Sequence, residues 1–100
     1  MTHPIYFNVE QARNQLSLVG WVYTLRKKRR TGTAIARQGS YYRWTRLGQV
    51  RILDVNGDNP SPEFLKGLVA GSGFSSLDDW LAHAPKGWNR VYEVRRVGKW

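Results

Sequence analysis

The segment GWVYTLR, residues 20–26, carries the side-chain alternation of a β-strand directly behind a glycine. Successive side chains of a strand point to opposite faces, so residues 21, 23 and 25 share one face and residues 22, 24 and 26 the other. Gly20 is a natural C-terminal stop, because glycine readily adopts the left-handed backbone that ends many helices. The segment therefore predicts a junction at which a helix ends and a strand begins.

The sequence on either side of this junction predicts one helix and three further strands. Asn8 has the side chain of a helix N-cap, and Gln11, three residues later, completes a capping box. Apolar residues then follow at near-helical spacing up to the glycine. The three strands are expected within residues 4–7, 32–37 and 44–55.

The C-terminal half predicts a dense turn, two short helices and a closing strand. Each helix start combines a capping serine with a proline or acidic residues in the first turn. The turn lies at residues 56–60. The helices are expected to begin at Ser61-Pro62 and at Ser75 or Ser76, and the strand spans residues 91–97. Short strands mixed with short helices predict one compact α+β domain over residues 1–100, built on a small sheet or barrel.

Composition limits the class of protein and its compartment. The chain has 100 residues, and 41% of them are hydrophobic, which is enough for one real core. It has no cysteine, so disulfides and thiolate metal sites are excluded. No apolar run approaches the ~20 residues of a membrane span, and the first residues lack the layout of a signal peptide. We therefore expect a soluble, cytoplasmic protein with no membrane partner.

The positive charge is concentrated in one part of the chain. The net charge is +9, and eleven of the sixteen basic residues are arginines. No acidic residue lies between Glu10 and Asp54, a stretch that holds ten basic ones, whereas residues 54–100 are balanced. Such a segment is typical of a protein that binds a polyanion. A basic, well-solvated face without a partner is the alternative. We expect a nucleic acid, with RNA favoured over DNA.

Two segments are the strongest candidates for this contact. Residues 26–30 are five consecutive cations, and an anion such as phosphate would relieve the repulsion between them. A flexible loop with no fixed partner is the alternative. Residues 41–46 interleave aromatics with arginines, and unpaired bases stack on aromatic faces. Tyr42 or Trp44 could instead belong to the core, and we expect only one face of this strand to be exposed. The candidate binding residues are Arg26, Lys27, Lys28, Arg29, Arg30, Arg37, Tyr41, Arg43 and Arg46.

Three segments, taken in order, resemble the ASCH domain of the PUA-like superfamily. Residues 20–26 resemble the strand after the family's first helix, and residues 48–55 (GQVRILDV) the strand before its two later helices. Residues 73–80 (GFSSLDDW) resemble the Gly-Phe-x-Ser segment that enters a helix. The resemblance covers nearly the whole chain. It implies a small mixed PUA-like β-barrel with about three flanking helices, a cleft lined by the Thr-x-Arg strand, and RNA binding.

The same resemblance raises the question of catalysis. Some small ASCH proteins resemble amidohydrolases that act on acetylated cytidine with a Lys, a Thr and a Glu, and others resemble ribonucleases. Thr24 falls at the threonine position and is the one catalytic candidate, but Trp21 replaces the lysine and Ser72 the glutamate. His3 and His83 have no recognisable partner in the sequence. We expect a binding module with no cofactor and no metal, and keep an RNA or modified-nucleoside hydrolase as the alternative.

Overall fold

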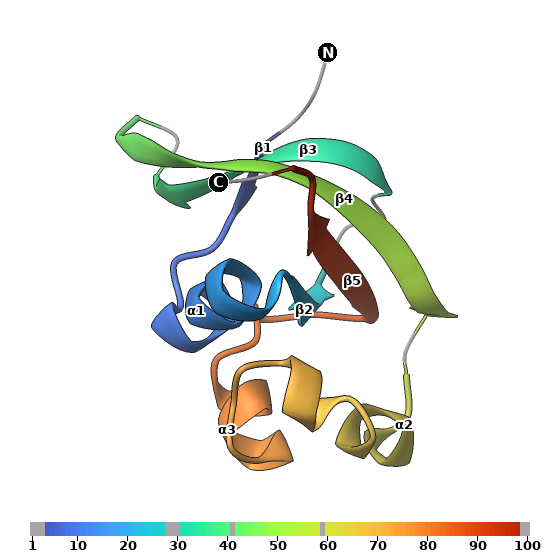
Figure 1. Ribbon diagram of the computed structural model, residues 1–100. Helices are drawn as coiled ribbons and strands as arrows, with labels where there is room; N and C mark the ends of the chain where they lie inside the picture. The colour runs from blue at the N-terminus through green and yellow to red at the C-terminus, as the bar shows by residue number, and fades with distance from the viewer. Residues whose placement is uncertain (1–3, 28–30, 41, 59, 99–100) are drawn as a thin grey trace.

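The computed structural model describes residues 4–27, 31–40, 42–58 and 60–98, with the backbone alone for residues 56–58. These residues form a compact α+β fold (Figure 1). The strands are β1 (Pro4–Tyr6), β2 (Trp21–Arg26), β3 (Gly32–Gly39), β4 (Trp44–Asp58) and β5 (Arg90–Arg96). The helices are α1 (Glu10–Val19), α2 (Pro62–Lys66), α3 (Leu77–Ala82) and the short 3-10 helix η1 (Val69–Gly71). The predicted α+β class and helix number are confirmed.

The five strands form one mixed sheet in the order β1-β3-β4-β5-β2. β1 runs parallel to β3, and the other pairings are antiparallel. The sheet curls into a half-barrel with β1 and β2 at its two edges (Figure 1). Within the described residues no ladder joins these two edges, so the expected barrel is open on that side. The short β1, three residues long, offers little length for a second pairing.

The core has two parts, one on each side of the strand β2. The first part fills the concave side of the sheet beneath α1, where Leu16 is completely buried. Its buried members are Ile5, Phe7, Leu16, Val22, Ala34, Ala36, Val50, Ile52, Tyr92 and Val94. The second part joins the sheet to α2 and α3, and its buried members are Leu25, Leu65, Phe74, Trp80 and Val91. Burial of this apolar surface fixes the helical layer against one end of the sheet.

The start of α1 differs from the sequence prediction. The N-cap is Val9, which makes no side-chain cap, whereas the side chain of Asn8 bonds elsewhere in the fold. Its Nδ2 donates to the carbonyl oxygen of Gly39 at 2.8 Å, and its Oδ1 accepts from the Gly39 amide at 2.6 Å. The capping-box prediction was therefore wrong, because a tertiary partner won over the local one. Gly20 does end the helix, with φ of 100°.

The predicted helix starts in the C-terminal half are confirmed, but the predicted turn is too long. Ser61 accepts from the amide of Phe64 at 3.2 Å, and Ser76 accepts from the amide of Asp79 at 3.1 Å. Residues 56–58 belong to β4. Its pairing with β5 is irregular after Asp54 and resumes at Asp58, the last residue of β4. Strand pairing here overrides the turn preference of Asn-Gly-Asp.

The longest helix, α1, has 10 residues, about half of what a membrane span requires. In the part of the chain that is described, no helix combines the length and apolar character needed to cross a membrane.

Candidate nucleic-acid interface

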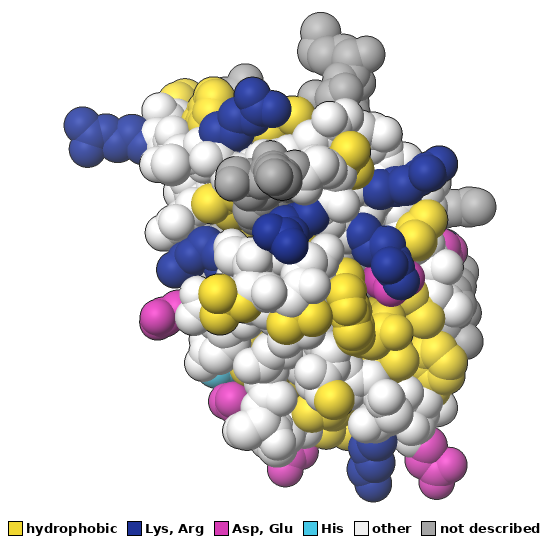
Figure 2. All heavy atoms as spheres, viewed as in Figure 1, with side chains coloured by type: hydrophobic (Ala, Val, Ile, Leu, Met, Phe, Trp, Pro, Cys, Tyr) yellow, Lys and Arg dark blue, Asp and Glu magenta, His cyan; other side chains and the backbone are white. Residues whose placement is uncertain are grey.

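Basic side chains gather at the sheet end of the molecule. Figure 2 shows Lys and Arg spread over that end and few of them at the helical end. Arg46 and Arg51 on β4 and Arg95 on β5 are exposed, as is Arg43 just before β4. Acidic residues lie in the first turns of α2 and α3. The fold therefore turns the charge asymmetry of the sequence into an asymmetry between two ends of the molecule.

The β3–β4 hairpin brings three of the candidate arginines together. Its tip extends beyond the rest of the sheet (Figure 1). Arg37 on β3 lies directly opposite Arg46 on β4, and Arg43 is in the turn that joins the strands. The guanidinium carbon of Arg37 lies 3.6 Å from the ring centroid of Trp44. No acidic residue occurs in the described part of residues 37–46, so every charged side chain described at the tip is a cation.

Both faces of the segment around the hairpin tip are exposed, which corrects the expectation of one exposed face. Tyr42 is 90% exposed, Trp44 is 45% exposed, and Arg43 is exposed as well. The expectation assumed strand alternation from residue 41, but β4 begins only at Trp44 and the residues before it form the turn. Neither Tyr42 nor Trp44 belongs to the core.

Internal hydrogen bonds hold the hairpin tip in place. The Ser40 amide donates to the carbonyl oxygen of Arg43 at 2.7 Å, and the Arg43 amide donates to the Ser40 hydroxyl at 3.2 Å. The two bonds from Asn8 fix Gly39 at the end of β3. Gly39 has φ of +125°, and a Cβ there would collide with the carbonyl oxygen of Arg43. The tip is therefore a defined turn that requires glycine.

A second group of arginines crosses the outer face of the sheet. Arg51 on β4 lies directly opposite Arg95 on β5, and both side chains are exposed. Like charges directly opposite each other on a sheet are unfavourable. Arg95 is partly compensated by Glu93, whose carboxylate lies 2.7 Å away. Sequence reasoning did not single out this pair, because the register between β4 and β5 cannot be read from either segment alone.

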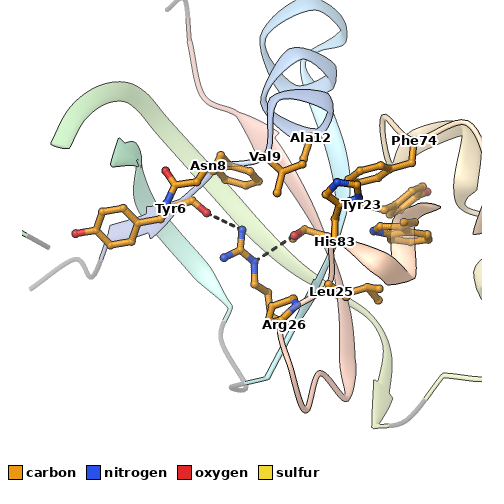
Figure 3. A pocket seen from close by; sticks show the side chains of 14 residues that line it. Tyr6, Asn8, Val9, Ala12, Tyr23, Leu25, Arg26, Phe74 and His83 are labelled. Atoms are coloured by element: carbon orange, nitrogen blue, oxygen red, sulfur yellow. Dashed lines mark hydrogen bonds between the residues drawn. The ribbon is translucent and has the colours of Figure 1, made fainter. Parts of the chain in front are cut away.

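Arg26 occupies a different environment from the hairpin arginines. Its Nε donates to Thr24 Oγ1 at 3.1 Å, and its Nη2 donates to the carbonyl oxygen of Tyr6 at 2.9 Å. The guanidinium also lies 5.1 Å from the ring centroid of Phe7. Thr24 and Arg26 lie on the same face of β2 and line a pocket of about 230 Å³ (Figure 3). The end of β2 thus borders a pocket.

His83 is the pocket residue that sequence reasoning missed. Its Nδ1 lies 2.9 Å from the carbonyl oxygen of Asp79, and its ring stacks on Phe74 at 5.1 Å between centroids. It lines the same pocket as Thr24 and Arg26 (Figure 3). The available signal was the spacing of four residues from Asp79, which places both side chains on one side of a helix. A hydrogen bond from Nδ1–H to that carbonyl leaves Nε2 as the acceptor.

Trp21 and Ser72, which stand where the resemblance would place a lysine and a glutamate, make structural contacts. Ser72 is buried; its hydroxyl donates to the Val69 carbonyl at 2.6 Å and accepts from the Phe74 amide at 3.1 Å. Trp21 packs edge-on against Tyr23, 5.2 Å between centroids. The residues lining the pocket include no carboxylate, and no three His, Asp or Glu of the described residues are grouped as metal ligands.

The remaining candidates are placed only in part. Lys27 is exposed and lines a second pocket that Arg26 also borders, together with Tyr6 and Tyr92. Lys28, Arg29, Arg30 and Tyr41 lie outside the described residues. Of the nine candidate binding residues, the structure therefore brings Arg37, Arg43 and Arg46 together on the hairpin and places Arg26 and Lys27 at the end of β2.

Comparison of the chain with protein-family models, with curated proteins and with solved structures gave no match.

Proposed function

We propose that this protein binds RNA through the sheet end of the molecule, with the tip of the β3–β4 hairpin as the main contact. The observation that carries this proposal is the clustering of Arg37, Arg43 and Arg46 around exposed aromatic rings on a projecting, acid-free tip. Arginine suits this role because its planar guanidinium can bind phosphate through two donors and can also stack on a ring.

The physical basis of this binding is the release of counterions from the phosphate backbone. Each phosphate that an arginine neutralises steepens the dependence of affinity on salt. The outward-facing pair of Arg51 and Arg95 extends the basic surface from the hairpin across the sheet. Because like charges directly opposite each other are unfavourable, a phosphate near this pair would relieve their repulsion. The basic run that follows Arg26 is part of the same proposal.

The preference for RNA and the finer fold assignment rest on the resemblance to ASCH domains. Two features support a PUA-like assignment: the order of elements around a mixed half-barrel, and the pocket bordered by Thr24 and Arg26. A cytoplasmic location belongs to the same proposal and rests on the absence of cysteine. Measuring binding to single-stranded RNA and to DNA of the same length separates an RNA preference from general polyanion binding.

Charge reversal at the hairpin tests the location of the binding surface. The variant carries Arg43→Glu and Arg46→Glu. Its control carries Lys66→Glu and Lys86→Glu, two exposed cations outside the hairpin, at the end of α2 and in the segment after α3, and so changes the net charge equally. We expect the hairpin variant to bind single-stranded RNA about tenfold or more weakly, and the control to bind nearly as well as the unaltered protein. Equal losses in both variants would show that only net charge matters.

A ribonuclease is the second candidate, and one observation favours it. His83 supplies the general base that the sequence did not offer, in a pocket that Arg26 also borders. In this reaction Nε2 of His83 takes the proton of a ribose 2′-hydroxyl, and the 2′-oxygen attacks the adjacent phosphorus. The phosphorus–5′-oxygen bond breaks, the 5′-oxygen takes a proton from water, and a 2′,3′-cyclic phosphate remains. The charge of Arg26 stabilises the phosphorane.

Incubation with a labelled single-stranded RNA tests this second candidate. Cleavage that ends in a cyclic phosphate and is lost in His83→Gln, while RNA affinity is retained, would support it. Cleavage that persists in His83→Gln would exclude His83 as the base. The pocket offers no carboxylate for amide hydrolysis, so we do not propose amidohydrolase activity.

A further inference from the structure

The contact between Arg37 and Trp44 follows from the register of the hairpin. Trp44 pairs with Gly39 and Arg46 pairs with Arg37, so these four residues share one face of the two strands. Gly39 has no side chain to fill the space opposite Trp44. The indole can therefore meet its diagonal neighbour Arg37, whose guanidinium carbon lies 3.6 Å from the ring centroid.

The other side of this indole remains accessible. Trp44 is 45% exposed although the guanidinium of Arg37 covers one face, so its exposure comes from the opposite face and the edges. The side chain of Arg37 is itself half-buried, and its Nε is buried without a hydrogen-bond partner. A ring fixed on one face by a cation and open on the other is a preformed stacking surface. Little side-chain freedom remains to be lost when a ligand stacks on it.

Polar and basic residues line a hollow that Trp44 also borders. An open hollow of about 630 Å³ lies beside the ring. The residues that line it are Gln38, Gly39, Tyr42, Arg43, Trp44 and Thr45. The guanidinium of Arg43 offers donors for phosphate or for base edges. Gln38 and Thr45 pair with each other and present their polar side chains on the opposite face of the hairpin from Trp44. A neutral stacking ligand such as a sugar would leave the arginines without counter-charges.

We propose that Trp44, held from behind by Arg37, is a stacking platform for one unpaired base of a single-stranded nucleic acid. Arg43 and Arg46 then contact the phosphates on either side of that base. This inference rests on the proposed function and narrows its ligand to single strands, because the bases of a duplex are already stacked on each other. Trp44 lies in the segment of residues 41–46 that the sequence singled out for base stacking, although it is not among the nine candidate binding residues.

Oligonucleotides with and without bases test the platform. The affinity of the protein is measured for a single-stranded RNA, for an abasic strand of the same length and charge, and for the duplex of the same sequence. We expect the strand with bases to bind best. In Trp44→Leu its affinity should fall about 5- to 150-fold, the effect of losing one base stack, while that of the abasic strand stays the same. Trp44→Phe keeps a ring and should retain most of the affinity.

The outcomes separate this inference from the proposed function. If the unaltered protein binds the abasic strand as tightly as the normal one, the platform does not exist, although RNA binding through phosphates stands. If Trp44→Leu weakens both strands equally, the Arg37–Trp44 contact only stabilises the hairpin, and the inference is again overturned. If the unaltered protein binds none of the three ligands, the proposed function itself fails.

Discussion

The guanidinium of Arg26 donates a hydrogen bond of 2.9 Å to the backbone carbonyl oxygen of Tyr6. Tyr6 is the last residue of β1 and Arg26 the last of β2, and these strands are the two edges of the half-barrel. The bond therefore crosses the open side of the sheet (Figure 3). At least two donors of Arg26 are engaged within the fold, since its Nε also bonds Thr24. This arginine holds the edges together as well as bordering a pocket.

Loss of this link should destabilise the protein. We expect Arg26→Ala to lower the free energy of unfolding by about 1.5–3 kcal/mol, the range for a hydrogen bond made by a charged group. Denaturant titration measures the loss. Lys27→Ala is the control, since that neighbour is exposed, and it should change stability little. Equal stability of the Arg26 variant and the unaltered protein would mean that the bond to Tyr6 contributes nothing.

Gly39→Ala should disrupt the hairpin tip. The backbone at this position has φ of +125°, which is unfavourable for alanine, and the new methyl group would meet the Arg43 carbonyl. We expect a loss of about 1–3 kcal/mol in denaturant unfolding together with weaker RNA binding. Gly67→Ala is a matched control, because φ there is −69° and the added methyl makes an ordinary contact. Unchanged stability in Gly39→Ala would contradict the turn geometry described above.

Asn8→Ala should loosen the hairpin and leave α1 intact. The side chain of Asn8 makes two hydrogen bonds to Gly39 and none that caps the helix. Because both bonds are exposed, we expect a loss of about 1–2 kcal/mol in total. Hydrogen exchange measures where it falls: amides of residues 37–45 should exchange faster, while those of α1 should not. Faster exchange at the start of α1 would restore the capping role that the sequence predicts.

The features that the sequence predicted well depend on neighbours along the chain. Gly20 ends α1, Ser61 caps α2 and Ser76 caps α3, since each of these bonds spans only a few residues. The alternation in β2 placed Thr24 and Arg26 on one face, and in the structure Arg26 Nε donates to Thr24 Oγ1 at 3.1 Å. Local hydrogen bonds and strand periodicity carry enough information for these assignments.

The features that escaped prediction depend on contacts between distant segments. Asn8 bonds Gly39, thirty-one residues away, instead of capping its own helix. His83 reaches the pocket of β2 because the helical layer packs against that strand, and Arg51 meets Arg95 only through the register of β4 with β5. Local sequence patterns determine none of these three contacts.

The basic run beyond Arg26 carries a prediction from sequence alone. Arg29→Glu with Arg30→Glu should weaken RNA binding and flatten its dependence on salt, because five consecutive cations are expected to contact phosphates. Filter binding at several salt concentrations measures both quantities. An unchanged affinity and an unchanged slope would remove this segment from the binding surface and leave the hairpin and the outer sheet face.

The salt dependence of single-stranded RNA binding tests the central claim most directly. The logarithm of the binding constant is plotted against the logarithm of salt concentration for the unaltered protein and for Arg43→Gln with Arg46→Gln, with Lys66→Gln and Lys86→Gln as the control. Two lost phosphate contacts should reduce the slope by about 1.4, at roughly 0.7 for each contact on a single strand. The control should keep the original slope. The same slope in all three proteins would contradict a phosphate-binding role for the hairpin tip.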